Sequence, residues 1–486
     1  MKLAKVFIRQ APMVAITAAL ATFLSACAPE NAVRVRKPEL VATEVTPEQK
    51  AADLSAPSGI TAFVLPAELE TPKLFAADLL PASMMSGPQF EVAPEIELKG
   101  HVAGFQVRSD YGRLDADSVE LLEQRVLEIS ALAELERLSE LKIFGKAALN
   151  SVKGTGKAVY NVFRDPAATA RAIPEGIRNK VSNTWAKIKL KTKELGDTAR
   201  SKIRGDGAPP EFNAFLPDPP MSAEKTWEDR AASQGTKFGL SYIGYSRSRR
   251  DLTRELGIDP YTSNPQIEDR LDAFAWSYLA GSAGTGLVVG ALTGGASAVL
   301  SKSRQINRLV YDLPPEDVKK RNATELQKIG IESDTARNFL RNSTFTPTLQ
   351  TAVVDQITRN WQAAGWKDLL RYLRYVDSEI EARFIVNALR MVATQPQENK
   401  LVAVFLVGAT PVFTLTDGTL LVPAPVDYVY YNDKLKAFLG EPQLRGKTVH
   451  LAISGKISEP AERAIAARGW TIMSGVSFRG VASYAQ

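Results

Sequence analysis

The chain has 486 residues, 45% of them hydrophobic and 23% charged, which indicates a globular protein of two or three packed domains and excludes a disordered chain. It holds one cysteine and two histidines, so disulfides and thiolate metal sites within the chain are excluded. The formal net charge is +6, and it is +3 without the first 26 residues, so the total charge identifies no partner.

Residues 1–26 have the three parts of a bacterial export signal. Lys2, Lys5 and Arg9 form its positive end, an uncharged stretch follows, and small residues precede the cleavage point. The uncharged stretch is too short and too rich in alanine to be a good membrane span. We therefore expect this segment to be absent from the mature protein.

The export signal ends in Leu24-Ser25-Ala26-Cys27, which resembles the lipobox of bacterial lipoproteins. This resemblance implies that Cys27 is acylated and becomes the mature N-terminus. Each buried methylene group contributes about 0.8 kcal/mol, so several acyl chains on one residue give an effectively permanent membrane anchor. The alternative is an ordinary cleaved signal followed by a chance cysteine. In lipoproteins an aspartate after the cysteine commonly marks inner-membrane retention, so Ala28 favours the outer membrane, with the protein facing the periplasm.

The first mature residues predict a tether and then a short β-containing segment. Residues 27–58 are rich in Pro, Glu, Ala and Val without a sustained period, which is typical of a flexible tether. Residues 59–115 contain a predicted strand at 102–107, and a turn follows it at 109–112.

Residues 116–223 form a predicted helical, basic segment. Apolar residues three or four apart predict a long helix that opens at Asp115, with Asp115 or Asp117 as its N-cap. Between residues 142 and 204, fifteen Lys and Arg stand against four acids. One interpretation is that this stretch contacts anionic lipid or lipopolysaccharide. The other, equally favoured, is that it forms a solvated, charged helical face. Nucleic acid is a poor partner for an exported protein.

Residues 224–398 predict a helical domain, with turns at 257–265 and 314–315 and a helix end at Gly330. Inside it, the uncharged stretch 273–301 carries a glycine stripe at four-residue spacing, formed by Gly286, Gly290 and Gly294. Such a stripe lets another backbone approach one helix face. The composition favours a buried helical hairpin, and the alternative is a membrane-remodelling or pore-forming segment.

Residues 399–486 predict a small α/β domain. An apolar strand at 401–407 precedes a hairpin around Asp417-Gly418, and another strand follows at 448–453. A helix with Ser458 as N-cap and Gly469 as its stop leads to a last strand near residues 470–473. The predicted fold class is therefore α+β, with a predominantly helical body and a small C-terminal α/β module.

Few residues are candidates for chemistry. Asp427, Tyr428 and Tyr430 form a weak candidate ligand patch, although a half-buried aromatic strand face is the favoured interpretation. Asp427 and Asp433 are the carboxylates that a hydrolase of envelope polymers would use. His101 and His450 are expected to be packing or surface residues. No catalytic residue, cofactor or metal is predicted, and the scarcity of His and Cys weighs against an enzyme without excluding one.

Four stretches resemble an uncharacterised family of proteobacterial proteins that has the same order of parts. They are the turn at 109–112, the segments 256–261 and 263–265, the stretch 339–348, and the hairpin that ends in Asp427-Tyr428. The resemblance covers most of the mature chain, and it implies one evolutionary unit but no catalytic residues. We therefore expect a membrane-anchored envelope lipoprotein with a binding or structural role, whose partner is an envelope protein of unknown identity.

Overall fold

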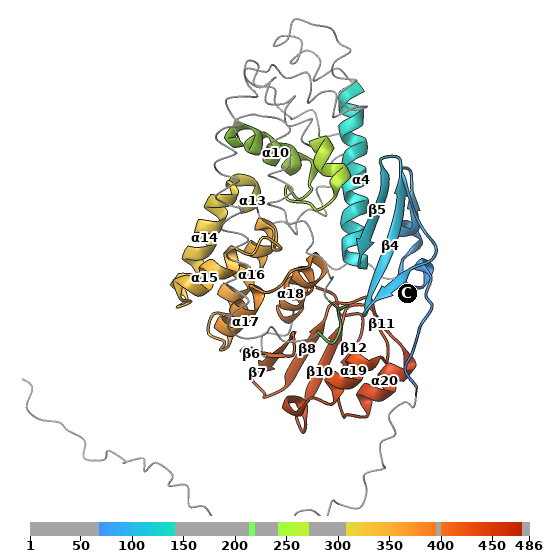
Figure 1. Ribbon diagram of the computed structural model, residues 1–486, viewed down its shortest axis with the longest axis vertical. Coiled ribbons are helices and arrows are strands. Elements are labelled where there is room, and N and C mark those ends of the chain that lie inside the picture. Colours follow the sequence, from blue (N-terminus) through green and yellow to red (C-terminus); the bar gives the residue numbers. More distant parts are fainter. Residues whose placement is uncertain (1–67, 141–212, 219–241, 272–307, 395–399, 479–486) are drawn as a thin grey trace, which may run out of the picture. The chain divides into compact units, whose positions relative to one another are not determined.

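The computed structural model describes residues 68–140, 213–218, 242–271, 308–394 and 400–478 (Figure 1). All of these residues belong to one compact unit of the chain, Phe63–Gln486. Helices and strands both contribute to this unit, which confirms the mixed α and β class.

An antiparallel sheet forms the first described segment. β4 is its central strand and pairs with β2, β3 and β5, and β1 extends the sheet beyond β2. Residues of β4 and β5 tend to alternate between buried and accessible positions, as expected for a sheet with one face on a core. The elements are α2 (Ala76–Leu79), α3 (Ala82–Met85), β1 (Ser86–Gly87), β2 (Phe90–Val92), β3 (Glu97–Lys99), β4 (Val102–Ser109) and β5 (Gly112–Asp117).

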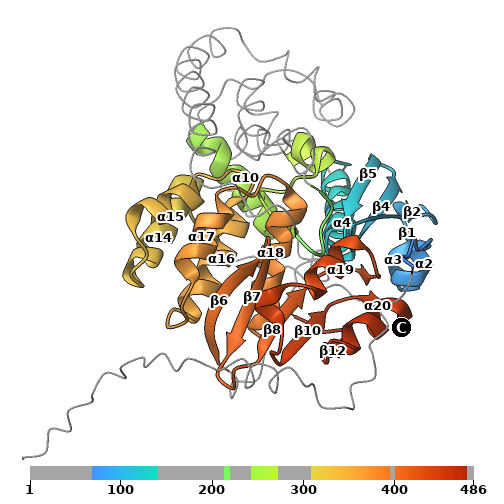
Figure 2. The same ribbon diagram turned by 60° about the horizontal axis from the view of Figure 1, so that its bottom comes forward.

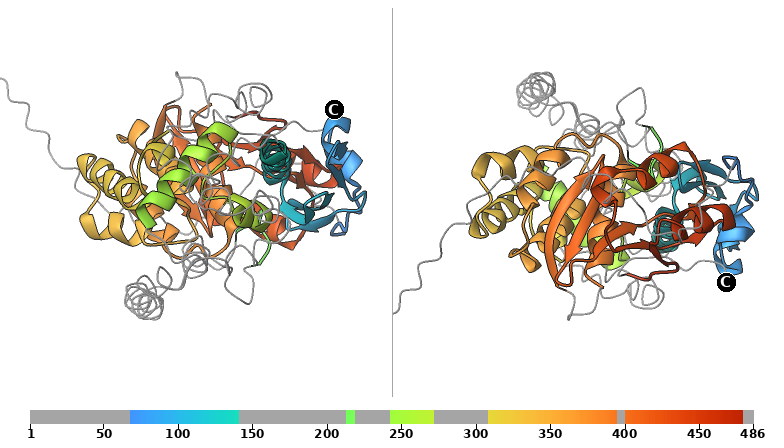
Figure 3. Two further views of the ribbon diagram at one scale, coloured as in Figure 1. Left: turned by 90° about the horizontal axis from the view of Figure 1, so that it is seen from above. Right: turned by 90° about the horizontal axis from the view of Figure 1, so that it is seen from below.

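The long helix α4 (Val119–Glu140) lies beside β4 and β5 (Figures 1 and 3). The prediction that Asp115 or Asp117 caps it is wrong, because β5 continues its pairing with β4 through Asp117. Ser118 takes the cap position instead, and its hydroxyl accepts a hydrogen bond of 3.0 Å from the backbone N–H of Leu121. Ser118 has a φ of 102°, so the chain turns sharply from strand to helix.

α4 contributes to two hydrophobic cores. Its first half packs on the N-terminal sheet through residues such as Leu122. Its second half packs through Leu132 and Leu135 against Leu252 and Leu256 of α10. One long helix therefore joins the N-terminal sheet to the helical segment that follows.

The middle of the described chain is helical. The predicted turn after α10 and the predicted helix end at Gly330 are confirmed, since Gly257 and Gly330 have φ angles of 69° and 84°. Pro315 stands at the first position of α14, where a proline costs no hydrogen bond. The helices are α10 (Tyr242–Leu256), α13 (Leu309–Asp312), α14 (Pro315–Lys328), α15 (Ser333–Leu340), α16 (Pro347–Arg359), α17 (Trp366–Leu373) and α18 (Glu379–Val392).

The C-terminal segment forms a five-stranded sheet of order β12-β10-β8-β7-β6 (Figure 2). β6, β7 and β8 are antiparallel neighbours, whereas β8, β10 and β12 are parallel and are connected through α19 and α20. The predicted hairpin, strands and Ser458-capped helix are confirmed. The elements are β6 (Leu401–Val407), β7 (Thr410–Leu415), β8 (Leu420–Ala424), β9 (Tyr428–Val429), α19 (Asp433–Leu439), the 3-10 helix η3 (Pro442–Leu444), β10 (Val449–Ile453), β11 (Lys456–Ile457), α20 (Glu459–Ala466) and β12 (Thr471–Met473).

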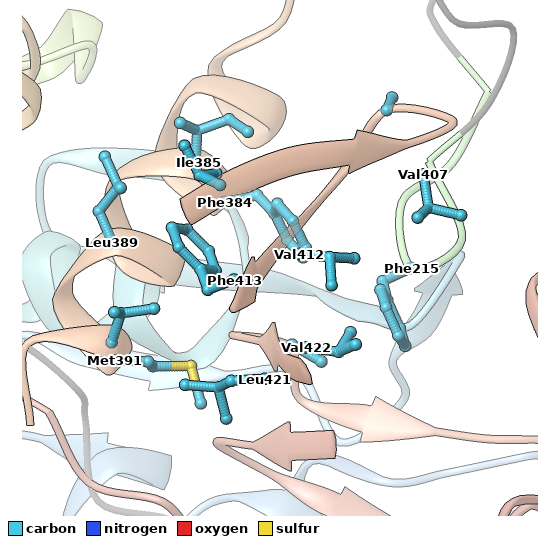
Figure 4. Packing of buried hydrophobic residues seen from close by; sticks show 14 of the residues in the cluster. Phe215, Phe384, Ile385, Leu389, Met391, Val407, Val412, Phe413, Leu421 and Val422 are labelled. Carbon is cyan, nitrogen blue, oxygen red and sulfur yellow. The ribbon is translucent and has the colours of Figure 1, made fainter. Parts of the chain in front are cut away.

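Helix α18 is fixed to this sheet by buried apolar side chains. Phe384, Ile385 and Leu389 of α18 belong to the same core cluster as Phe413 of β7 and Leu421 of β8 (Figure 4). Burying a large apolar side chain contributes about 1.5–3 kcal/mol relative to leaving it exposed. The start of α18, with the charged residues Glu379 and Arg383 described below, is therefore held in a defined place.

The segment before α17 covers part of the outer edge of β6. The backbone of Ala364 exchanges hydrogen bonds of 2.8 and 2.9 Å with Val402 and Val404. The next residue, Gly365, has a φ of 90°, and a Cβ atom there would lie 1.8 Å from the carbonyl oxygen of Val404. Glycine is needed at this position for both reasons.

We expect Gly365→Ala to lower the free energy of unfolding by about 2 kcal/mol or more, because it adds a backbone clash to an unfavourable φ angle. Gly418→Ala is the matched control, since Gly418 has a φ of 84° but nothing lies within 4 Å of an added Cβ. The free energy of unfolding of this control should fall by only about 1 kcal/mol. Urea unfolding followed by circular dichroism measures both variants, and equal losses would contradict the close approach at Val404.

Candidate functional site

A turn of small polar residues follows α10 and lies against two other helices. Asp259 accepts hydrogen bonds at its Oδ1 from the backbone N–H of Tyr261 at 2.9 Å and from the Thr348 hydroxyl of α16 at 2.8 Å. The following residues, Thr262, Ser263 and Asn264, direct their side chains toward charged groups of α4 and α18. The structure thus brings residues 256–261 into contact with the stretch 339–348.

Glu128 of α4 is the fully buried centre of this polar network. Its carboxylate accepts hydrogen bonds of 2.9 Å from Arg125 and Asn264, and a further one from the hydroxyl of Thr262. Gln124 donates another bond of 2.9 Å. A buried carboxylate is tolerated only when it is paired and hydrogen-bonded in this way.

Arg383 and Glu379 of α18 form the second half of the network. Ser263 connects the two halves, because its hydroxyl accepts from Arg125 at 2.6 Å and donates to Glu379 at 2.8 Å. Arg383 donates to Glu379 at 2.8 Å and lies 3.3 Å from both carboxylate oxygens of Glu120. The side chains of Arg383 and Glu120 are only 13% and 14% exposed, so solvent screens this pair weakly.

The environment moves the pKa values of two carboxyl groups in opposite directions. Burial alone would raise the pKa of Glu379, but the positive charges of Arg383 and Arg125 and the bonds from Ser263 and Arg383 lower it to about 2. Burial raises the pKa of Asp259, and this effect exceeds that of its hydrogen bonds from Tyr261 and Thr348. Glu379 is therefore a fixed negative charge near neutral pH and a poor proton acceptor.

The network ties four segments that are far apart in the sequence: α4, the turn after α10, the start of α16 and the start of α18. The hydroxyl and amide side chains of the network form hydrogen bonds with charged residues of the same chain. Directed, charge-assisted hydrogen bonds of this kind fix the mutual positions of the helices. Sequence reasoning missed this site, although Asp259 and the run Thr262-Ser263-Asn264 together supply four side chains able to form hydrogen bonds in one turn.

Asp427 is a second buried carboxylate, in the segment that follows β8. It is 1% exposed, and its two oxygens accept backbone N–H bonds from Ala103 at 2.8 Å and from Val119 at 3.0 Å. Val119 is the first residue of α4, so the charge of Asp427 also lies at the positive end of that helix. Asp433, by contrast, is exposed at the start of α19.

The neighbouring residues of the sequence-predicted ligand patch face the same N-terminal segment. The backbone N–H groups of Asp427 and Tyr428 both donate to the carbonyl oxygen of His101 at 3.1 Å. The N–H of Tyr430 donates to Nδ1 of His101, whose ring lies 4.9 Å from that of Tyr430. Burial lowers the pKa of His101 to about 3, so the imidazole is neutral and can accept this bond. Within the patch the Asp427 carboxylate is thus engaged by the chain itself, whereas Tyr428 and Tyr430 are half-buried.

Several predicted features lie outside the described residues. These are the export signal with Cys27, the tether 27–58, the basic stretch 142–204 and the segment 273–301 with Gly286, Gly290 and Gly294. His450, which is described, lies in β10 as predicted. Asp417 accepts a hydrogen bond of 2.9 Å from the backbone N–H of Thr419, in agreement with the turn assigned to it.

We expect Glu379→Gln to remove part of the stability that depends on the network. The pKa of Glu379 is lower in the folded protein than its ordinary value of 4.5, so its contribution is present above pH 4.5 and disappears as the pH falls toward 2. The free energy of unfolding of the wild type should exceed that of the variant by about 2–3 kcal/mol at pH 6. Near pH 2 the two values should be almost equal. Urea unfolding across this range measures the difference, and a pH-independent difference would refute the ion pairing.

We expect Asp427→Asn to lower the free energy of unfolding by about 3 kcal/mol, because one of two buried backbone N–H groups then faces an amide donor. Asp433→Asn removes the same charge from an exposed helix start six residues later and should cost less than about 1 kcal/mol. Urea unfolding at pH 7 compares the two variants. Equal, small losses would mean that Asp427 does not hold the N-terminal sheet and α4.

Among the described residues, no group of three or more His, Cys, Asp or Glu side chains is arranged to hold a metal ion. No helix within these same ranges combines the length and apolar character needed to cross a membrane. Comparisons with protein-family models, curated proteins and solved structures found no match to this chain.

Proposed function

We propose that this protein is a lipid-anchored lipoprotein of the bacterial cell envelope whose folded part has a binding or structural role. The observation that carries the proposal is the sequence Leu24-Ser25-Ala26-Cys27 at the end of an export signal. The outer membrane, with the folded part in the periplasm, is the proposed location because Ala28 rather than an aspartate follows the cysteine. Residues 142–204 are a candidate contact with anionic lipid or lipopolysaccharide.

The geometry of the charged groups supports a binding or structural role. Glu128 and Asp427 are buried, and each accepts hydrogen bonds from segments more than 100 residues away. Such bonds hold parts of one chain together and produce a rigid body suited to presenting a surface to a partner. We also infer that helices predominate over the whole folded part and that the strands after residue 399 form a small module within it.

We expect Cys27→Ser to abolish acylation and to move the protein from the membrane fraction to the soluble periplasmic fraction, because the lipid is the proposed anchor. Metabolic labelling with a clickable palmitate analogue, followed by separation of inner and outer membranes, measures both effects. Label on the Ser variant, or membrane retention without label, would contradict the anchor.

The binding role requires a separate test in the same cells. Crosslinking of the wild type in intact cells, followed by mass spectrometry, should recover one envelope protein reproducibly. The Cys27→Ser variant is the control, because a partner in the outer membrane should be recovered less often once the anchor is lost. Failure to recover a reproducible partner with the wild type would count against the binding role but not against the anchor.

A further inference from the structure

The first described residues, 68–74, form an extended strap that precedes the folded N-terminal sheet. Leu69 is 45% exposed, and Glu68 next to it is also exposed. The strap ends at Phe75, which forms an isolated β-bridge with Glu95, and Ala76 continues with a backbone bond of 2.8 Å to Pro94. From Phe75 onward the chain therefore has backbone partners within the N-terminal segment itself.

Glu70 attaches the strap to the C-terminal sheet region. Its backbone N–H donates to the carbonyl oxygen of Tyr431 at 2.8 Å, and its Oε2 accepts from the backbone N–H of Tyr431 at 2.6 Å. The same oxygen accepts from the hydroxyl of Ser458 at 2.6 Å. Ser458 is also the N-cap of α20, so one glutamate connects the strap to two C-terminal segments.

This attachment differs from the inner one at Asp427. The donors are buried in both places, Ala103 and Val119 for Asp427 and Tyr431 and Ser458 for Glu70, but Asp427 itself is only 1% exposed and both of its oxygens accept bonds. Glu70 is half-buried, only one of its oxygens accepts the two bonds described above, and its neighbours in the strap are exposed. Segments with few buried contacts open at a lower free energy than the buried core.

We propose that residues 68–74 are a releasable latch, closed by Glu70 on Tyr431 and Ser458, which opens while the fold from Phe75 onward stays intact. Opening frees seven residues, about 24 Å of extended chain. The next consequence rests on the proposed lipid anchor. In a chain anchored at Cys27, the latch lies in sequence between the tether and the folded part. Its opening lengthens the tether and lets the folded part reach further from the membrane.

Hydrogen exchange at single backbone amides tests the latch on the full mature chain carrying Cys27→Ser, so the result does not depend on acylation. In this protein the amide of Tyr431 should exchange at least about a hundredfold faster than that of Val119. Glu70→Ala should accelerate the Tyr431 amide roughly tenfold or more and leave Val119 unchanged. Glu68→Ala, the same change at an exposed neighbour, should alter neither amide.

Three results would overturn the latch. If Tyr431 is protected as strongly as Val119, or if Glu70→Ala accelerates both amides equally, the strap is part of the cooperative fold. If Glu70→Ala leaves the Tyr431 amide unchanged, Glu70 does not close the strap. If the labelling test shows that the protein has no lipid anchor, opening of the latch would not lengthen a tether. The exchange rates given above would still be expected.

Discussion

The carboxylate of Asp427 is the contact on which the joining of the N-terminal and C-terminal parts depends. It accepts hydrogen bonds from β4 and from the first residue of α4, at the point where the strand and the helix meet. Neither backbone N–H can reach water from a fully buried position, so without Asp427 two donors would be left unsatisfied. The position of the N-terminal sheet and the start of α4 are thus set by one residue of the C-terminal segment.

The network around Glu128 applies the same principle between α4, α16 and α18. There each carboxylate has an arginine partner within the cluster, because Arg125 pairs with Glu128 and Arg383 pairs with both Glu120 and Glu379. Removing one member of such a pair costs far more than the pair contributes, since the remaining charge stays buried. Polar ties of this kind select one arrangement of α4, α16 and α18 rather than add much stability.

Local structure followed from the sequence where neighbouring residues decide it. The hairpin at Asp417-Gly418 and the helix capped by Ser458 depend on side chains within three residues of the backbone groups they bind. The role of Asp427 could not be predicted, because the two backbone N–H groups that donate to its carboxylate lie more than 300 residues earlier. β5 was missed for a related reason: its acidic residues suggest a helix start until β4 is present as a partner.

The long separation of these contacts also explains why charged ties alone are insufficient. Closing a loop of 308 residues costs about 5 kcal/mol of chain entropy, more than two hydrogen bonds to a carboxylate return after desolvation. Apolar contacts must supply the remainder, and they do: Tyr428, next to Asp427, packs on the N-terminal core, and Val102 of β4 belongs to the C-terminal core. Asp427 therefore determines where the two parts meet, while the interlocked cores provide the free energy that keeps them together.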